Sequence, residues 1–438
     1  MTIAIALSVS PDPLAIAASL AGRPGLAVLA SRPQGAPRPG DARYSFVASD
    51  PVEASDELVP GGHERSAGAW DGASPGPRWI GVAPYEALRG IERPGWTRHP
   101  DDRPAHLLSK PAWRRYLAVI RIDHATGRVA VEGDDEASVA SLARAVRSTR
   151  PPGGFGLRVL PPDEPDRAHL ERVRAALELI AAGDLYQVNL ARRIPLALEG
   201  DPLGLFASLL EAAPAPWGFF QDLGEVLVVG VSPELALSVR GDELRTCPIK
   251  GTRPRGRDAT EDVRMAHDLE ADPKERAELA MAIDVHRSDL GRVAVPGSVR
   301  LTGGPRALPG RTVWSRVAEV VARRADGVSL EDVARAVLPC GSVTGAPKVR
   351  AMEVIANLEP WRRGVYAGAF GYVARDGGLE LAMAIRTIQA GEARGDRERA
   401  GTYFAGGGIV ADSDPQRELE ETRWKAAQLV RLSMLGRG

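Results

Sequence analysis

Two pairs of acidic residues stand out because the members of each pair are three positions apart in a predicted helix. They are Glu275 with Glu278, and Glu418 with Glu421. Residues at this spacing lie on one face of a helix, so each pair directs two carboxylates the same way. If the two faces met, they would form an all-oxygen pocket of the kind that Mg²⁺ prefers. Acidic pairs on helices more often form solvent-exposed faces, so the pattern alone does not establish a metal site.

A second candidate is Lys250, which stands between a predicted strand and a loop rich in Gly, Pro and Arg. An enclosed lysine loses hydration, and its pKa falls towards the range in which the neutral amine is nucleophilic. The simpler alternative is a solvated lysine at the end of a strand.

A predicted hairpin brings Glu234 close to Lys250. A two-residue turn at 241–242 sets Glu234 opposite Ile249, with Lys250 facing the other way. A bulge or a longer loop would instead set Glu234 and Lys250 opposite each other. An acid beside an amine can serve as general acid and nucleophile, whereas an exposed pair would be an ion pair worth under ~1 kcal/mol.

Two loops of small residues complete the candidates. The segment 341–348 fails the P-loop pattern, because Ala346 and Pro347 stand where Gly-Lys is required. It still offers a hydroxyl and backbone N–H groups before a helix, which suit a carboxylate. A ligand could approach the backbone closely at 406–408, and Lys425 adds a cation one turn beyond Glu421. Ordinary turn chemistry is the alternative for both loops.

The elements that must position these residues follow from apolar spacing and turn residues. Helices are predicted at 136–147, 163–182, 272–288, 330–337, 348–358 and 416–432. Strands are predicted at 27–30, 43–47, 79–80, 116–122, 186–190, 225–229, 235–240, 243–249, 368–373 and 379–386. Because helices and strands do not alternate strictly, the pattern favours an α+β fold. The run Pro-Pro-Gly-Gly at 151–154 divides the chain into an N-terminal subdomain, 1–150, and a catalytic domain, 160–435.

Composition excludes several classes of function. The 56 basic and 57 acidic residues nearly balance, so no nucleic-acid partner is expected. Two cysteines cannot form a disulfide framework, which suits a reducing cytoplasm. The apolar N-terminus is interrupted by Pro11, Asp12 and Pro13, so neither a signal peptide nor a membrane span is expected. Residue chemistry alone thus indicates a Mg²⁺-dependent enzyme for a small polycarboxylate, or a non-catalytic binder of an anionic metabolite.

Taken together, the segments resemble the chorismate-utilising enzymes. This family contains component I of anthranilate synthase and of aminodeoxychorismate synthase, with the isochorismate and salicylate synthases. The resemblance covers about 163–432 and is weaker before that. It is carried by the motifs at 186–190 (YQVNL), 232–234 (SPE), 248–252 (PIKGT), 272–278, 289–292, 341–348 and 407–421. It implies two antiparallel β-sheets packed face to face with helices outside.

The resemblance also implies roles for single residues. Glu278 and Glu421 would bind Mg²⁺, with Glu275 and Glu418 close behind, while Glu234 would protonate the C4 hydroxyl of chorismate as it leaves. The positions that match substrate contacts are Gln187, Thr252, Ser342, Tyr366, Arg386, Gly406, Gly407 and Lys425.

Two positions distinguish branches of the family. Members that use water carry a Lys base where this chain has Gln187, and anthranilate synthases usually carry Ala where it has Lys250. The Lys is similar to the aminodeoxychorismate synthase branch, in which that amine attacks C2 and ammonia then adds at C4. The resemblance implies a glutaminase partner that supplies the ammonia. The alternatives are anthranilate synthase component I and a 2-amino-2-deoxyisochorismate synthase.

The N-terminal part resembles the tryptophan pocket of the family. The matching positions are Ser31, Arg43, Tyr44, Ser45, Pro214 and Trp217. The acidic residue usual before Ser31 is Ala30 here, so a structural strand edge is the preferred interpretation.

Overall fold

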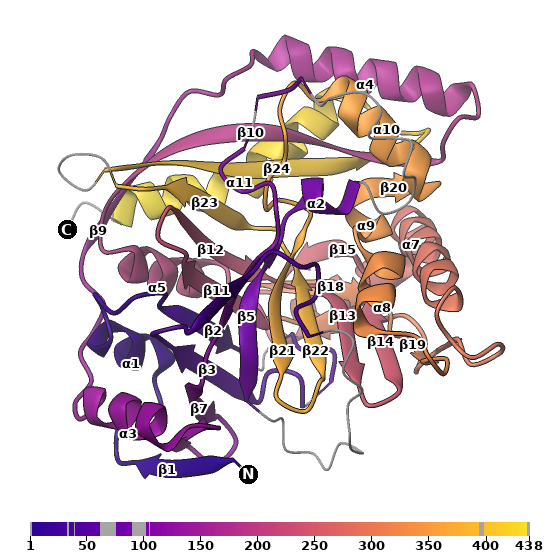
Figure 1. Ribbon diagram of the computed structural model, residues 1–438. Coiled ribbons are helices and arrows are strands. Elements are labelled where there is room, and N and C mark those ends of the chain that lie inside the picture. Colours follow the sequence, from indigo (N-terminus) through magenta and orange to yellow (C-terminus); the bar gives the residue numbers. More distant parts are fainter. Residues whose placement is uncertain are drawn as a thin grey trace.

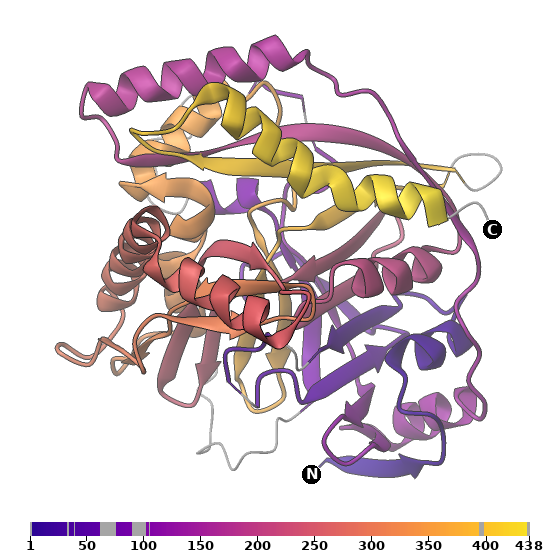
Figure 2. The ribbon, with the colours of Figure 1, turned by 180° about the vertical axis from the view of Figure 1, so that it is seen from behind.

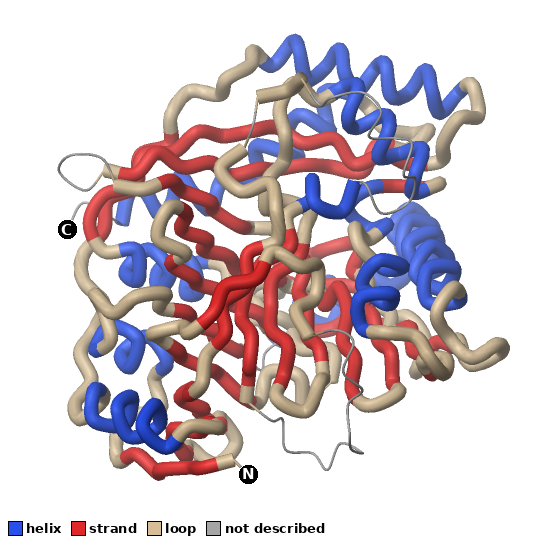
Figure 3. Tube along the Cα trace, in the orientation of Figure 1, coloured by secondary structure: helices blue, strands red, loops and turns tan. Residues whose placement is uncertain are grey.

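The computed structural model describes residues 2–32, 35–38, 40–61, 76–89, 102–104, 106–393 and 398–435. Within them, the strands form two large antiparallel sheets and one small one, and helices surround these sheets (Figures 1 and 3). This arrangement confirms the predicted fold class and adds the third, small sheet to it.

The first sheet has twelve strands in the described part of the chain. In spatial order they are β1 (Ile3–Leu7), β8 (Arg128–Gly133), β7 (Ala118–Asp123), β3 (Tyr44–Ala48), β2 (Ala27–Ser31), β11 (Trp217–Asp222), β12 (Val226–Ser232), β23 (Thr387–Gly391), β24 (Arg399–Ile409), β10 (Gln187–Gly200) and β20 (Gly345–Ala346). The twelfth, β9 (Phe155–Val159), also pairs with β10.

The other two sheets hold the remaining described strands. The nine-stranded sheet runs β16 (Arg300–Leu301), β19 (Val320–Arg323), β14 (Glu243–Cys247), β13 (Leu235–Arg240), β22 (Leu379–Met383), β21 (Ala369–Ala374), β5 (Pro77–Ala83), β6 (Ala112–Arg115) and β4 (Glu53–Ser55). The small sheet runs β15 (Ile249–Pro254), β18 (Val313–Val317) and β17 (Arg306–Pro309). Strands from 1–150 therefore belong to both large sheets, and the predicted division near residue 150 stays a prediction.

The two large sheets face each other across an apolar layer. Phe219 of β11 stacks on Phe370 of β21 with ring centroids 4.7 Å apart. Buried side chains of this layer include Leu29, Phe46, Ile80, Val82 and Val228. Each fully buried side chain of this size contributes roughly 1.5–3 kcal/mol, so this layer holds the two sheets together.

Helices cover the outer faces. They are α1 (Pro13–Ser19), α2 (Tyr85–Arg89), α3 (Glu136–Ala145), α4 (Asp166–Ala181), α5 (Pro202–Ala212), α6 (Ala259–Ala271), α7 (Pro273–Gly291), α8 (Leu330–Val337), α9 (Gly341–Thr344), α10 (Lys348–Leu358) and α11 (Pro415–Leu435). Figure 2 shows α11 lying across the back of the first sheet, along β24. No helix in the described ranges is both long enough and apolar enough to cross a membrane.

The caps fix where the acidic helix begins. Asp272 is the N-cap of α7, and its side chain accepts hydrogen bonds from the backbone N–H groups of Lys274 and Glu275. Pro273 follows at the first helical position, where its missing N–H costs nothing. This start places Glu275 and Glu278 in the first two turns.

The predicted hairpin is confirmed at its tip, where Arg240 pairs with Glu243. The register then shifts between Leu235 and Ser238, and Leu235 pairs with Cys247. The single strand predicted over 243–249 is wrong, because the chain leaves the second sheet after Cys247 and enters the small sheet as β15. Pro248 stands at the break, where it has no N–H to donate to a ladder.

Candidate active site

Glu234 occupies the short connection between β12 and β13 and is only 4% exposed. Its Oε1 accepts a hydrogen bond of 2.6 Å from Ser342 Oγ. Burial raises its pKa to about 7, although the Ser342 hydrogen bond, the charge of Lys250 and the backbone N–H of Ile249 each lower it. Near neutral pH, the Glu234 carboxyl group is thus protonated in a substantial fraction of the molecules.

Lys250 reaches the same point from β15. Its Nζ donates to the backbone carbonyl of Ser342 at 3.2 Å. Burial lowers the pKa of this amine, against the opposing charges of Glu278 and Glu234. Glu234 and Lys250 therefore both contact Ser342. The register in which their side chains would face opposite sides of the hairpin does not occur. The register shift in the hairpin and the exit at Pro248 account for this.

The first acidic pair lies on α7. Glu275 accepts from Arg253 at 3.1 Å, and Arg253 also pairs with Asp272 at 2.6 Å. The pKa of Glu278 is raised, chiefly by burial and further by the charges of Glu275 and Glu421. The two helices therefore bring their predicted acidic faces within electrostatic reach of each other.

The second pair lies on α11. Glu418 Oε1 accepts from Ser413 Oγ at 2.7 Å, whereas its Oε2 is buried without a hydrogen-bond partner. Glu421 pairs with Lys425 at 2.6 Å. In the ranges the structure describes, no three acidic, His or Cys side chains are close enough to hold a metal ion together. Mg²⁺ commonly takes one or two carboxylates and several waters, so this donor set and the orphaned Glu418 oxygen fit a hydrated ion.

The three glycines at the end of β24 explain how these side chains approach one another. A Cβ added at Gly408 would lie 2.2 Å from Gln187 Nε2 and 3.7 Å from Lys250 Nζ. A Cβ added at Gly407 would lie 2.9 Å from Glu418 Oε2. Side chains from β10, β15 and α11 thus converge on a strip of backbone that only glycine leaves open.

Tyr366 closes another side of the same strip. Its hydroxyl lies 2.6 Å from the position that a Cβ at Gly406 would take. Its ring stacks on Phe404 with centroids 5.3 Å apart. Asn189 Nδ2 donates to its hydroxyl at 3.4 Å. Asn189 was missed in the sequence, although it lies two positions after Gln187 and therefore on the same side of β10.

Arg386 supplies the cation best suited to a carboxylate ligand. Its φ of 49° is in the left-handed region, which non-glycine residues rarely adopt. Burial lowers its pKa, and the described residues give its guanidinium no acidic partner. Lys425, in contrast, is held by Glu421 and by the carbonyl of Gly406 at 2.7 Å. Arg386 is half-buried and no carboxylate of the described residues neutralises it, so it suits an anionic ligand.

Most of the predicted catalytic, metal and substrate residues thus lie around Ser342 and residues 406–408. Thr252 is the exception, because its side chain is exposed on β15 and makes no hydrogen bond to the other site residues. The assigned roles of all these residues remain predictions.

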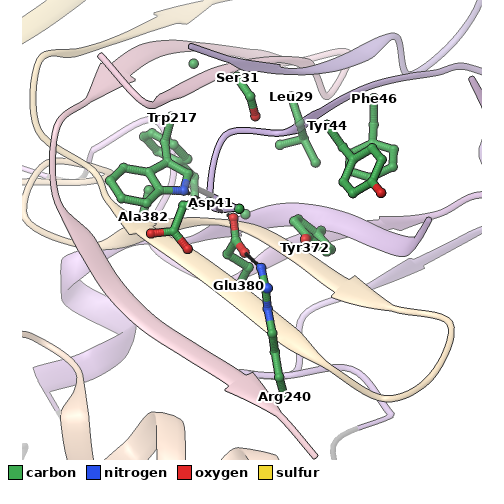
Figure 4. Close-up of a pocket in the computed structure, with 14 residues that line it drawn as sticks. Leu29, Ser31, Asp41, Tyr44, Phe46, Trp217, Arg240, Tyr372, Glu380 and Ala382 are labelled. Carbon is green, nitrogen blue, oxygen red and sulfur yellow. Dashed lines mark hydrogen bonds and ion pairs between the residues drawn. The ribbon is translucent and has the colours of Figure 1, made fainter. Parts of the chain in front are cut away.

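The predicted tryptophan-like residues lie elsewhere, around a small cavity of about 40 Å³ between the two large sheets (Figure 4). Ser31, Tyr44 and Trp217 line it. Trp217 Nε1 donates to Glu380 at 3.1 Å, and Arg240 pairs with the other oxygen of Glu380 at 2.8 Å (Figure 4).

The other three residues of that prediction do not line the cavity. Arg43 pairs with Asp123 at 2.8 Å. Ser45 accepts from the backbone N–H of Ser31 at 2.9 Å and so joins β3 to β2. Pro214 lines a separate surface groove.

Comparison with known proteins identifies the family of the chain. The family model for chorismate binding enzymes matches residues 43–431. Anthranilate synthase component 1 of Streptomyces coelicolor is 36% identical over 426 residues, covering 89% of this chain and 81% of the relative. The protein of the same name from Thermus thermophilus is 40% identical over 364 residues, covering 80% and 76%.

Solved structures agree in fold. Anthranilate synthase component I from Streptococcus pneumoniae superposes with a TM-score of 0.75 at 29% identity, covering 89% of this chain and 92% of that one. The menaquinone-specific isochorismate synthase of Escherichia coli has a TM-score of 0.72 at 20% identity, covering 99% and 94%, and supports the fold alone.

The chain belongs to the chorismate-binding enzyme family. Within it, the chain is a chorismate-utilising enzyme similar to anthranilate synthase component I. The names of the relatives support the alternative of anthranilate synthase better than the aminodeoxychorismate synthase branch.

Proposed function

We propose that the protein adds ammonia to chorismate. The observation that carries the proposal is the meeting of Glu234 and Lys250 at Ser342, with carboxylates from α7 and α11 beside them. Glu234 has the protonation needed to donate a proton to the C4 hydroxyl as it leaves as water. Gln187 occupies the position of the water-activating base, which disfavours water as the nucleophile.

Chorismate carries two carboxylates, and the pocket offers a place for each. Arg386 can pair with one of them. Glu278 and Glu421, with Glu275 and Glu418 behind them, would hold Mg²⁺, which withdraws charge from the ring carboxylate during departure of the hydroxyl. Tyr366 and the glycine strip bound the remaining space.

The relatives favour anthranilate as the product. In that reaction ammonia adds at C2, the C4 hydroxyl leaves as water, and pyruvate is then eliminated so that the ring becomes aromatic. Because ammonia is mostly ammonium at neutral pH, a glutaminase partner that delivers it remains part of this proposal.

Lys250 favours a second candidate, the formation of 4-amino-4-deoxychorismate. The Lys250 amine would attack C2 and expel the C4 hydroxyl. Ammonia would then add at C4 and release the lysine, so the enolpyruvyl group stays on the ring. The Lys250 amine lies beside an acid and burial lowers its pKa, which supports this route.

One incubation separates these outcomes. The protein is mixed with chorismate, Mg²⁺ and an ammonium salt, and the products are identified by chromatography and mass spectrometry. An aromatic amine with pyruvate supports the first candidate, and an amine that keeps the enolpyruvyl group supports the second. Lys250→Ala should abolish turnover only in the second case. Chorismate that binds and stays unchanged would overturn both and favour the non-catalytic binder.

A further inference from the structure

A fully buried arginine behind the pocket joins several segments that form it. Arg363 follows α10 and is 0% exposed. Its Nη2 donates to the carbonyl of Asn189 at 2.6 Å, and its Nη1 donates to the carbonyl of Val343 at 3.2 Å. Asn189 lies on β10 and Val343 on α9, so one guanidinium spans two elements that are distant in the sequence.

Glu359 completes this connection from the end of α10. Its two oxygens accept from Arg363 at 2.7 and 2.8 Å, and both side chains are fully buried. Glu359 Oε1 also accepts from the backbone N–H of Ala191 at 2.9 Å. The ion pair therefore binds β10 twice, once through a carbonyl and once through an N–H.

Arg363 also contacts the aromatic side of the pocket. Its guanidinium carbon lies 5.4 Å from the ring centre of Tyr366 and 4.9 Å from that of Tyr85. The backbone N–H groups of Arg363 and Gly364 donate to Glu86 of α2 at 2.6 and 2.7 Å. Helix α2 thus supports the turn that carries Arg363.

The elements fixed by this pair carry the residues of the candidate site. Val343 directly follows Ser342, which contacts both Glu234 and Lys250. Asn189 donates to Tyr366 on the opposite side of the pocket. The position of one guanidinium therefore sets the separation of the two sides.

We propose that Arg363 and Glu359 are positioning residues, which hold Ser342 and Tyr366 at the separation that the reaction requires. The kinetic part of this inference rests on the proposed function, whereas its structural part does not. The alternative is a pair that only stabilises the fold. Buried ion pairs can often be replaced by apolar residues of similar volume without loss of stability, so the two roles are separable.

The test is the double variant Arg363→Met with Glu359→Met. We expect the variant to fold with a lowered melting temperature, because neither charge is left unpaired but three buried backbone groups lose their partners. We expect kcat to fall ~100-fold with a smaller change in KM, since a misplacement of about 1 Å costs this much. Hydrogen exchange should become faster in peptides covering 187–192, where the Ala191 N–H loses its acceptor. It should also become faster in 341–346, because the Val343 carbonyl loses its donor and the segment loosens.

The pH profile gives a readout that a stabilising role would not move. The Ser342 hydrogen bond lowers the pKa of Glu234. When Ser342 is loosened, this pKa rises, so the alkaline limb of kcat moves to higher pH in the variant. The other groups that lower this pKa are Lys250 and the N–H of Ile249. Lys250 is itself held by the Ser342 carbonyl, so its displacement would raise the pKa in the same direction.

A matched control exists on α8, where Arg335 pairs with Glu331 at the same four-residue spacing but near the surface. Its double Met variant should keep wild-type kinetics and exchange. Arg363→Lys is the second test variant, in case the Met variant does not fold. It keeps the charge but loses the planar fork that reaches Asn189 and Val343 together, so kcat should fall as in the Met variant.

Unchanged exchange at 341–346 in a folded variant would overturn the inference, as would wild-type kcat and pH profile. If the wild type itself does not convert chorismate, the proposed function fails. The exchange comparison between the Met variant and its control still decides whether Arg363 positions Ser342.

Discussion

Two regions of the molecule hold buried charges in opposite ways. In the small cavity between the sheets, Glu380 is satisfied by Trp217 and Arg240 (Figure 4). Buried Asp41, which also lines this cavity, pairs with Arg245. In the candidate active site, two charged groups are not fully satisfied. Arg386 has no acidic partner among the described residues, and one oxygen of Glu418 is buried without a hydrogen bond.

The difference separates charges that serve the fold from charges that await a ligand. An unpaired buried charge destabilises a protein, so it persists where a bound molecule supplies its partner. Substitutions in the active site should therefore lower activity without lowering stability, and those around the cavity should do the reverse.

The largest effect is expected for Glu421→Gln. Removing this carboxylate should abolish Mg²⁺-dependent turnover, because the proposed ion loses a principal ligand. The rate is measured against Mg²⁺ concentration, and the metal affinity by calorimetry. Asp412→Asn, on the exposed loop before α11, is the control. Turnover that still depends on Mg²⁺ would refute the assignment of Glu421.

Glu234→Gln should lower kcat by ~10²–10⁴-fold, the usual contribution of a general acid. In the wild type, kcat should fall as the pH rises through about 7, because the acid loses its proton there. A wild-type rate that stays flat from pH 6 to 9 would argue against Glu234 as the acid.

The same substitution tests the stability half of the comparison. The pKa of Glu234 is raised in the folded state, from 4.5 to about 7. The folded protein therefore holds a proton that the unfolded chain releases, and stability declines as the pH rises from about 4.5 to about 7. Glu234→Gln should remove this decline. Its melting temperature relative to the wild type should be higher at pH 8 than at pH 5, as measured by calorimetry.

Arg386→Gln should raise KM for chorismate by ~30-fold or more, because a ligand carboxylate loses its charged partner. The melting temperature without ligand should stay equal or rise, since a half-buried charge without an acidic partner is removed. Titration of chorismate against both proteins gives the affinities. A clear loss of stability would place Arg386 among the charges that serve the fold.

The smallest effect on catalysis is expected for Glu380→Gln, beside the inter-sheet cavity. The substitution weakens the bond to Arg240, so we expect a loss of about 1–3 kcal/mol in the free energy of unfolding. We expect kcat and KM to remain within about twofold of wild type. Denaturant unfolding and steady-state kinetics measure both quantities. A large change in kinetics would show that the cavity and the active site are coupled.

Local patterns predicted much of the site. The residues of each acidic pair and of the hairpin turn lie within a few positions of one another, and α8 and α10 begin and end where apolar spacing placed them. The helices α5 and α6 were missed. Helix α5 is apolar on most sides, and α6 is mostly polar, so neither shows one clear face.

The remaining features depend on contacts between distant parts of the chain. The chain leaves the nine-stranded sheet at Pro248 because the residues that follow, in β15, pair with β18 instead. The contact of Arg363 with Asn189 joins positions 174 residues apart, and no local spacing encodes it. Glu234 and Lys250 could thus be predicted from the sequence, whereas the ion pair of Arg363 and Glu359 could not.

The place of β5 has a consequence for how the protein is made. This strand pairs with β21, which is synthesised about 290 residues later. At the usual speed of translation, roughly 5–20 residues per second, the edge of β5 that faces β21 waits for ~15–60 s. During that time the unpaired edge of β5 in the nascent chain can form non-native pairs with other strands. Slower translation should therefore increase the demand for chaperones during synthesis.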